Sequence, residues 1–191
     1  DAASGVGDFE ATAFEIAGEQ SRFFRRDGGW WIATTGEDGA TAEYEVAYTF
    51  GADPLQQYLV EFPDGRLQAY GVAWDTRAPE EGGQRWFHVY GDDPPVAGES
   101  IHWTGIDQNW NYMCADCHST NLQKNYDAKT DSYHTTWSEI DVSCEACHGP
   151  GSRHVKWAEI PDMARPQKEN YELVVKTAGI NSREQVELCA P

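Results

Sequence analysis

Two motifs of the form Cys-x-x-Cys-His constrain this chain more than any other feature of its sequence. Their two copies consist of Cys114, Cys117 and His118, and of Cys144, Cys147 and His148. This spacing is typical of covalent attachment of a c-type haem. Two thiols three residues apart reach the two vinyl groups of one porphyrin edge, and the next imidazole ligates the iron. The sequence therefore predicts two covalently bound haem c groups, with His118 and His148 as proximal iron ligands.

Paired cysteines also occur in zinc sites and in redox-active disulfides. Two Cys-x-x-Cys pairs a few tens of residues apart can build a four-thiolate zinc site, but such a site needs no histidine directly after each pair. A pair that closes on itself is typical of thioredoxin-like folds, and no βαβ pattern surrounds either pair here. Both alternatives are weaker than haem attachment.

The fifth cysteine stands near the end of the chain, in Cys189-Ala190-Pro191. It resembles the first cysteine of a third haem motif, so we expect the chain to be a fragment whose longer form binds a third haem at Cys189. Upstream, Ser182-Arg-Glu-Gln185 predicts a capping box that begins a helix. The alternative is that Cys189 is a free cysteine that anchors no haem.

Histidines outside the motifs are candidates for the distal side of the haem iron. In order of preference these are His102, His88, His154 and His134. Of the two methionines, Met113 adjoins Cys114 and cannot easily swing to the distal face, which leaves Met163. We therefore predict His/His axial ligation, which implies low-potential, low-spin haems. His154 follows His148 so closely that we expect it to ligate the iron of a neighbouring haem.

The first part of the chain has the pattern of a β-rich module. Alternating apolar residues predict about four to six antiparallel strands, in segments 30–34, 42–50, 57–62, 66–74 and 85–90. In one of them, strict alternation predicts that Tyr44, Val46, Tyr48 and Phe50 share one face. Asp64-Gly65 predicts a tight hairpin turn.

After residue 105 the pattern becomes irregular. Helices are predicted over 153–159, 169–176 and 182–189, with the two Cys-x-x-Cys-His motifs on short helices or turns. The predicted fold class is therefore α+β, with an antiparallel β meander in residues 1–105 and an irregular, mostly helix-and-loop haem-binding region in 106–191. Because buried porphyrins replace side-chain core, we expect the C-terminal half to unfold without haem.

The charge of the chain bears on its partners and its compartment. It has 32 acidic and 14 basic residues, a formal net charge of −18. Nucleic acid is therefore an improbable partner, whereas a basic redox protein, life in high salt or a merely solvated acidic surface all fit. No stretch approaches the roughly 18 apolar residues of a membrane span. Because haem is attached to thiols after export, we expect a periplasmic or extracellular protein.

The residues around the motifs resemble a known family. Segments 109–121 (NWNYMCADCHSTN) and 144–154 (CEACHGPGSRH) are similar to multihaem c-type cytochromes of the tetrahaem cytochrome c554 type, whose larger members carry tetratricopeptide repeats. The resemblance extends to 54–62 and 82–88. It implies electron transfer through closely stacked bis-histidine haems, with neighbouring haem subunits or self-assembly as partners. In that family pattern the histidine corresponding to His154 ligates the haem of an upstream motif outside this sequence.

Three functions follow, of which we favour an electron carrier over an enzyme. The second is a multihaem redox enzyme in which one open haem site acts on a small nitrogen or oxygen species, and the resemblance permits one five-coordinate haem. Such an enzyme needs proton donors near the iron, and Tyr112, Tyr133 and Arg153 are near the motifs in sequence. The third is a structural subunit whose haems mainly hold its fold.

Overall fold

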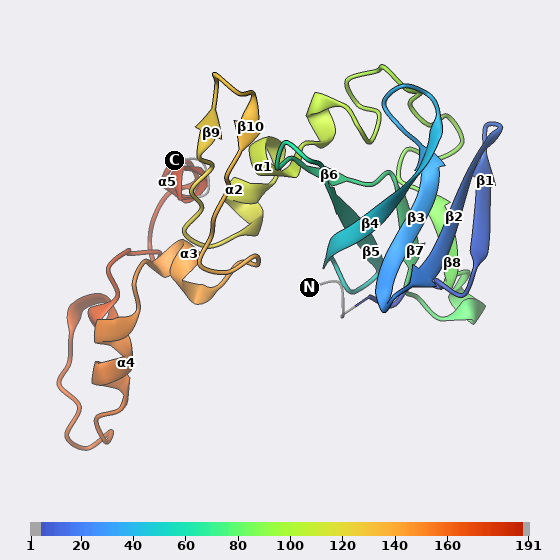
Figure 1. Ribbon diagram of the computed structural model, residues 1–191. Coiled ribbons are helices and arrows are strands. Elements are labelled where there is room, and N and C mark those ends of the chain that lie inside the picture. Colours follow the sequence, from blue (N-terminus) through green and yellow to red (C-terminus); the bar gives the residue numbers. More distant parts are fainter. Residues whose placement is uncertain (1–4, 189–191) are drawn as a thin grey trace. The chain divides into compact units, whose positions relative to one another are not determined.

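The computed structural model describes residues 5–188, and Figure 1 shows its helices and strands. The strands are β1 (Thr12–Ile16), β2 (Glu19–Arg26), β3 (Gly29–Thr35), β4 (Thr41–Phe50), β5 (Leu55–Glu61), β6 (Leu67–Ala69), β7 (Val72–Asp75), β8 (Arg85–His88), β9 (Tyr126–Asp127) and β10 (Ser132–Tyr133). The helices are α1 (Trp110–Met113), α2 (Ala115–His118), α3 (Cys144–His148), α4 (Ser152–Ala158) and α5 (Ser182–Glu187), with 3₁₀ turns η2 (Pro79–Glu81), η3 (Ile106–Gln108) and η4 (Glu169–Glu172). Cys189, the predicted third haem anchor, lies outside the described residues.

The chain divides into two compact units. Unit 1 contains the described residues up to Met113 together with Asp127–Tyr133, and unit 2 contains the rest, from Cys114. Unit 1 extends past residue 105, where the sequence pattern changes, because α1 packs into it. Trp110 in α1 is 1% exposed, and the Asn111 Oδ1 accepts a hydrogen bond of 2.6 Å from the Leu67 backbone N–H.

Unit 1 is built on one antiparallel sheet. Its strands are hydrogen-bonded in the order β1-β2-β3-β4-β5-β7-β8, and β6 pairs with β5. The two end strands are also linked, because the Trp86 Nε1 donates a hydrogen bond of 3.1 Å to the Thr12 Oγ1. The sheet has eight strands rather than the expected four to six. The sequence pattern misses β1 and β2 because charged residues surround the inward-facing Phe23.

Aromatic side chains fill the core of unit 1. Phe23 and Trp86 stack with ring centroids 3.6 Å apart and an interplanar angle of 6°, and Phe9, Tyr58 and Tyr70 are buried nearby. Rings of this size bury much apolar area each, and offset or edge-to-face pairs add to it. The core of this unit is therefore supplied by its own side chains.

The strand prediction for β4 is confirmed, but the predicted face is wrong in part. Val46 pairs with Val60, whereas Tyr48 pairs with Leu59, so a β-bulge interrupts the ladder between them. An extra residue reverses the alternation of side chains after it. Tyr48 therefore does not share the face of Val46.

The segment 66–74 forms two strands rather than one. Its first part, β6, pairs with β5 through the predicted Asp64-Gly65 turn, which the Phe62 backbone N–H closes by donating to the Arg66 carbonyl at 2.8 Å. Its second part, β7, pairs with the start of β5 and with β8. Tyr70 and Gly71 separate the two strands, so the chain crosses from one end of β5 to the other.

In unit 2, two helix predictions agree with the structure and one is wrong. Helices α4 and α5 fall within the predicted ranges 153–159 and 182–189 to within one residue. The capping box of α5 begins one residue earlier than predicted, because Asn181 is the N-cap. The Asn181 side chain accepts a hydrogen bond from the Glu184 backbone N–H, and the Glu184 side chain accepts one from the Asn181 backbone N–H. Segment 169–176 contains the 3₁₀ turn η4 rather than a helix, since three consecutive residues there have positive φ.

Candidate haem-binding site

The first motif forms a single helical turn. Cys114 is the N-cap of α2, and its carbonyl oxygen accepts hydrogen bonds from the backbone N–H of Cys117 at 3.1 Å and of His118 at 3.0 Å. Residues three apart on a helix lie on one face, so this turn presents both cysteines to the same side. Cys117 and His118 are exposed. Beside them, the Asp116 carboxylate pairs with the Lys124 ammonium at 2.5 Å.

The second motif forms the slightly longer helix α3. The Gly149 N–H donates to the Glu145 carbonyl at 2.9 Å, which ends the helix. The Glu145 side chain then accepts a hydrogen bond of 2.7 Å from the Gly151 N–H. Gly149 has a φ of 69°, a backbone conformation that favours glycine. The Gly149-Pro150-Gly151 turn is thus held directly against the motif.

The two motifs are tied together by Thr120, which follows the first motif by two residues. Thr120 is 3% exposed. Its Oγ1 accepts a hydrogen bond of 2.9 Å from the Ser143 N–H, directly before the second motif, and donates to the Asp141 carbonyl at 2.9 Å. The Thr120 N–H donates to the Glu139 carbonyl at 2.9 Å. The structure therefore brings the end of the first motif and the start of the second together through a buried hydroxyl.

The four motif cysteines are not joined in disulfide bonds. Burial, with a smaller contribution from Cys117, raises the pKa of the Cys114 thiol. Among residues 5–188, no group of three or more histidine, cysteine, aspartate or glutamate side chains is arranged to hold a metal ion. The described part of the chain therefore does not assemble the cysteines into the four-thiolate cluster that a structural zinc ion requires.

His148 carries an unsatisfied polar atom. Its Nδ1 is buried and has no hydrogen-bond partner in the described structure, while its backbone carbonyl accepts a hydrogen bond of 3.1 Å from the Val175 N–H. A buried nitrogen without a partner costs about 1–3 kcal/mol in lost solvation. The surroundings of this imidazole are therefore incomplete with protein atoms alone.

Unit 2 has almost no core of its own. Of its described residues, only Ala115, Ser119 and Thr120 are buried. Apolar side chains beyond them stay exposed, including Val155, Val174 and Met163, the last of which is fully exposed. A compact unit with so little buried apolar surface fits a prosthetic group that supplies the missing core. The donor set of two thiols and one imidazole in each motif fits haem c.

His154 lies on α4 and is held by a backbone carbonyl. Its Nδ1 is 2.8 Å from the carbonyl oxygen of Tyr171, which can accept but not donate, so the Nδ1 carries the proton. In the neutral imidazole, Nε2 is then unprotonated and has a lone pair available to a metal. Metal-ligating imidazoles are commonly oriented through such a bond from the second ring nitrogen.

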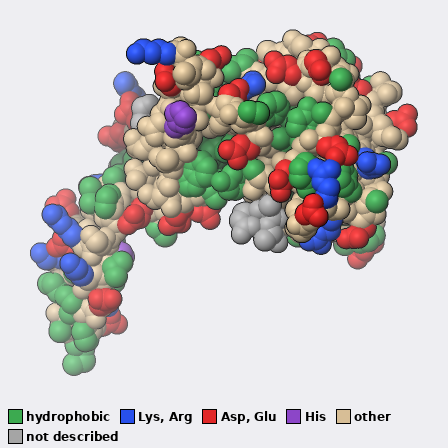
Figure 2. Space-filling model, viewed as in Figure 1, with side chains coloured by type: hydrophobic (Ala, Val, Ile, Leu, Met, Phe, Trp, Pro, Cys, Tyr) green, Lys and Arg blue, Asp and Glu red, His purple; other side chains and the backbone are tan. Residues whose placement is uncertain are grey.

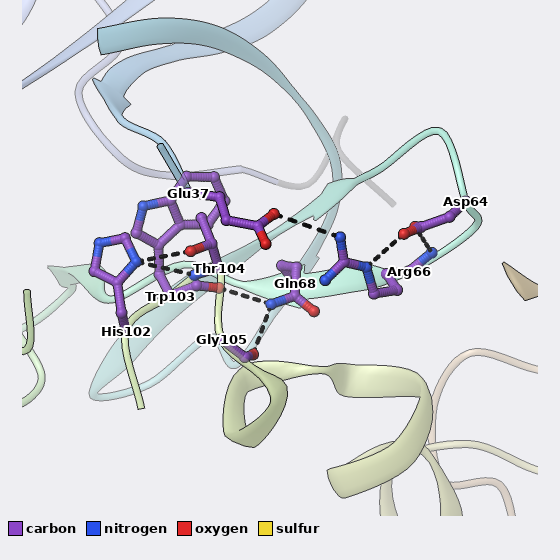
Figure 3. Close-up of polar contacts among 8 residues, drawn as sticks. All are labelled: Glu37, Asp64, Arg66, Gln68, His102, Trp103, Thr104 and Gly105. Atoms are coloured by element: carbon purple, nitrogen blue, oxygen red, sulfur yellow. Dashed lines mark hydrogen bonds and ion pairs between the residues drawn. The ribbon is translucent and has the colours of Figure 1, made fainter. Parts of the chain in front are cut away.

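His102 lies in unit 1, in the network drawn in Figure 3. It is 3% exposed, and its Nδ1 is 2.8 Å from the Thr104 Oγ1. The Gln68 Nε2 donates to the carbonyl oxygens of Trp103 at 3.0 Å and Gly105 at 2.9 Å. This buried amide therefore fixes the turn that carries His102, and burial lowers the pKa of its imidazole.

His88 is oriented less favourably for iron. Its Nδ1 accepts a hydrogen bond of 3.2 Å from the Tyr90 N–H, so the neutral imidazole carries its proton on Nε2. His88 and His102 line a cavity of about 30 Å³, enough for a water molecule and far too small for a porphyrin. Burial lowers the pKa of His88. His134 is exposed in unit 2.

The sequence analysis missed several residues that position these side chains. Thr120, Tyr171 and Gln68 carry no motif, and their roles depend on backbone groups far away in the chain. Asn170, with a φ of 50°, and Asn181, the N-cap of α5, do carry a local signal, since asparagine favours left-handed backbone and helix N-caps. As predicted, both motifs lie on short helices, the first on α2 with Cys114 as its N-cap and the second on α3.

Comparison with known proteins supports the resemblance over the region of the motifs. Residues 97–149 match the family model described as cytochrome c554 and c-prime. The matched segment contains both motifs, His102 and His134. Neither curated proteins nor solved structures gave a significant match. The family match supports a c-type cytochrome that carries covalently bound haem c, and it favours haem over zinc for the paired cysteines.

Two further properties bear on the setting of this site. Figure 2 shows aspartate and glutamate side chains scattered across the visible face, with lysine and arginine gathered in a few places. Within residues 5–188, no helix has the length and apolar composition needed to cross a bilayer.

Proposed function

We propose that this chain transfers electrons through two covalently bound c-type haems, one at each Cys-x-x-Cys-His motif. The observation that carries this proposal is the pairing of two partly exposed motif helices with a unit that buries almost none of its own residues. The family match over residues 97–149 supports it independently. We further propose export to the periplasm or the cell exterior, where haem is attached to thiols.

The cysteines and the histidines of the motifs hold the haem in different ways. The cysteines form thioethers with the porphyrin, and His118 and His148 ligate the iron on the proximal side. When bound, haem c supplies a reversible one-electron couple. Thr120 keeps the two motif segments adjacent, an arrangement that suits electron exchange between neighbouring haems.

For the distal side, the hydrogen bonds favour His154 over His88. His154 donates its Nδ1 proton to a carbonyl, an arrangement that leaves Nε2 for iron. The His102 Nδ1 is 2.8 Å from the Thr104 hydroxyl and accepts from the Thr104 N–H at 3.4 Å, so these bonds do not select its Nε2 for iron. In His88 the Nδ1 is the acceptor, so ligation through Nε2 would need a change of tautomer and the loss of that bond. His/His ligation implies low-potential, low-spin haems.

The acidic surface supports a basic redox partner. A net charge of −18 attracts a positively charged protein over distances comparable with the Debye length, about 8 Å at physiological salt. The rate of electron exchange with a small basic redox protein should therefore fall as salt is added. A rate independent of salt would contradict this choice of partner.

The test of the function is a haem count combined with spectroscopy on the haem-loaded chain. A pyridine haemochrome assay and the intact mass should give two haems per chain, and EPR of the oxidised protein should show low-spin iron. A count of zero would overturn the proposal. A high-spin signal of the oxidised protein that changes with nitrite or hydroxylamine, or an optical spectrum of the reduced protein that changes with carbon monoxide, would instead favour an enzyme with one open haem site.

A further inference from the structure

We propose that Asn170 is a positioning residue, which holds His154 in the tautomer that presents Nε2 to iron. The inference rests on the proposed function, because it assigns a role to a residue outside the haem motifs. It depends on a short loop, residues 169–175, which we call the carbonyl loop. This loop touches two of the candidate ligands.

The backbone of the carbonyl loop is strained. Asn170, Tyr171 and Glu172 have φ values of 50°, 56° and 62°, in the left-handed region. Residues other than glycine rarely adopt this conformation, and asparagine tolerates it best. Such strain persists only where the surroundings hold it, and it is enriched at functional sites. The sequence pattern itself favours a regular helix here, so other contacts must hold the loop.

The Asn170 side chain supplies those contacts. Its Nδ2 donates to the carbonyl oxygens of Leu173 at 3.0 Å and Val175 at 2.9 Å. Its own carbonyl accepts from the Leu173 N–H at 2.9 Å. An ion pair of 3.0 Å between the Lys168 ammonium and the Glu172 carboxylate spans the same turn. One amide therefore ties the first strained residue to the end of the loop.

The closed loop delivers a backbone group to each of two histidines. The Tyr171 carbonyl accepts the Nδ1 proton of His154 at 2.8 Å. At the other end, the Val175 N–H donates to the His148 carbonyl at 3.1 Å. Trp157 packs between the rings of His154 and Tyr171, with centroid distances of 5.8 and 5.6 Å. The loop thus fixes the tautomer of one candidate ligand and the backbone of another.

The first test measures the tautomer of His154 directly. In the reduced, haem-loaded chain, where low-spin iron is diamagnetic, ¹⁵N NMR at pH 8 should show His154 protonated at Nδ1, with Nε2 on iron. In Asn170→Ala and Asn170→Asp the ratio of this form to unligated His154 protonated at Nε2 should fall about five- to tenfold, since losing ordinary hydrogen bonds shifts an equilibrium by that order. Asn170→Asp keeps a residue tolerant of left-handed backbone but removes the donors.

The matched control is Asn121→Ala. Asn121 lies in the same unit, has a φ of 55° and donates from its amide to the Ser138 hydroxyl at 3.0 Å, yet it has no bond to the carbonyl loop. This variant should leave the His154 tautomer unchanged. An unchanged tautomer in both Asn170 variants, or protonation at Nε2 in the unsubstituted chain, would overturn the inference.

A second readout links the tautomer to iron. In the His154→Ala chain a fraction of the haem should become high-spin and bind carbon monoxide when reduced, and Asn170→Ala should show part of that fraction. Added imidazole should restore the low-spin spectrum in both. If His154→Ala keeps every haem low-spin, there is no ligand to position and the inference fails. A haem count of zero, by contrast, overturns the proposed function itself.

Discussion

At the scale of single residues, the chemistry of the motifs is local. Two thiols and an imidazole within five residues need only one helical turn to act together, and both motifs have that turn. The remaining histidines differ, because the partner of each Nδ1 decides whether Nε2 is available. These partners are Tyr171 for His154, Thr104 for His102 and Tyr90 for His88.

Substitutions in the motifs should separate attachment from ligation. Cys117→Ala or Cys147→Ala removes one of two thioethers, so less haem should stay bound after denaturing extraction, and the α band of the pyridine haemochrome should shift to the red. His118→Ala or His148→Ala should leave an anchored haem with an altered spectrum. The intact mass measures the first effect and optical spectroscopy the second. Full haem retention and an unshifted α band in the cysteine variants would contradict thioether attachment.

Asp75 should make the stability of unit 1 depend on pH. Its carboxylate bonds to the Arg77 guanidinium at 2.6 Å, and mainly that bond lowers the pKa of Asp75 from 3.8 to about 2. Because the folded pKa is depressed, the stabilisation is present above pH 4 and is lost as the pH falls toward 2. Thermal unfolding followed by tryptophan fluorescence should give Asp75→Asn a lower Tm at pH 6 and a smaller change between pH 4 and 2.

The control for this prediction is Asp92→Asn, in an exposed loop of the same unit. It should unfold like the unsubstituted chain at every pH. Equal Tm values for Asp75→Asn and the control at pH 6 would refute a stabilising role for the Asp75–Arg77 pair.

At the scale of elements, close approaches between backbone segments set the turns. Gly65, with a φ of 80°, lies in the hairpin between β5 and β6, where an added Cβ would overlap the carbonyl oxygen of Tyr133. The Tyr133 N–H donates to the Asp64 carbonyl at 2.8 Å, so the β9–β10 hairpin is docked on this turn. Gly39, in the turn between β3 and β4, has a similar φ of 77° and nothing within 4 Å of an added Cβ.

The two glycines form a matched pair for a stability measurement. Gly39→Ala should lower the free energy of unfolding by about 1 kcal/mol, because alanine is strained at positive φ. Gly65→Ala should cost about 2–4 kcal/mol, because the Tyr133 backbone must also move. Urea denaturation followed by tryptophan fluorescence compares them. Equal losses would mean that the contact with Tyr133 contributes nothing.

At the scale of the molecule, the two units differ in how they obtain a core. Unit 1 buries an aromatic cluster that includes Phe23, Tyr58 and Trp86. Unit 2 buries three of its described residues, none of them larger than threonine. Stability therefore need not be uniform along the chain, and ligand removal should act on the unit that lacks side-chain core.

A chain without haem should keep unit 1 folded and lose the fold of unit 2. Replacing all four motif cysteines by serine prevents covalent attachment with little change in volume. Hydrogen exchange should then show strong protection in the strands of unit 1 and loss of protection throughout α3, α4 and α5. Protection of these helices equal to that in the haem-loaded chain would show that unit 2 folds without the group.

The sequence by itself determined the chemistry of the motifs and most strands of unit 1. The two thiols and the imidazole of each Cys-x-x-Cys-His motif lie within one helical turn. Strands such as β3 and β4 follow from the alternation of apolar and polar residues, because successive side chains of a strand face either the core or the solvent. Both signals reside in neighbouring residues. For that reason the segments 30–34 and 42–50 could be assigned before any contact was known.

Only the tertiary structure decided the bulge in β4, the crossing from β6 to β7 and the carbonyl loop. Each depends on hydrogen bonds or packing contacts that cannot be read from the pattern of apolar and polar residues in the segment itself. In segment 169–176, helical periodicity competes with the amide bonds of Asn170, and the difference between the two outcomes is a few hydrogen bonds. A contact between residues 17 positions apart therefore fixes the tautomer of His154, whereas the Nδ1 partners of His102 and His88 lie two residues away in the chain. The two Cys-x-x-Cys-His motifs, by contrast, are contained in ten residues.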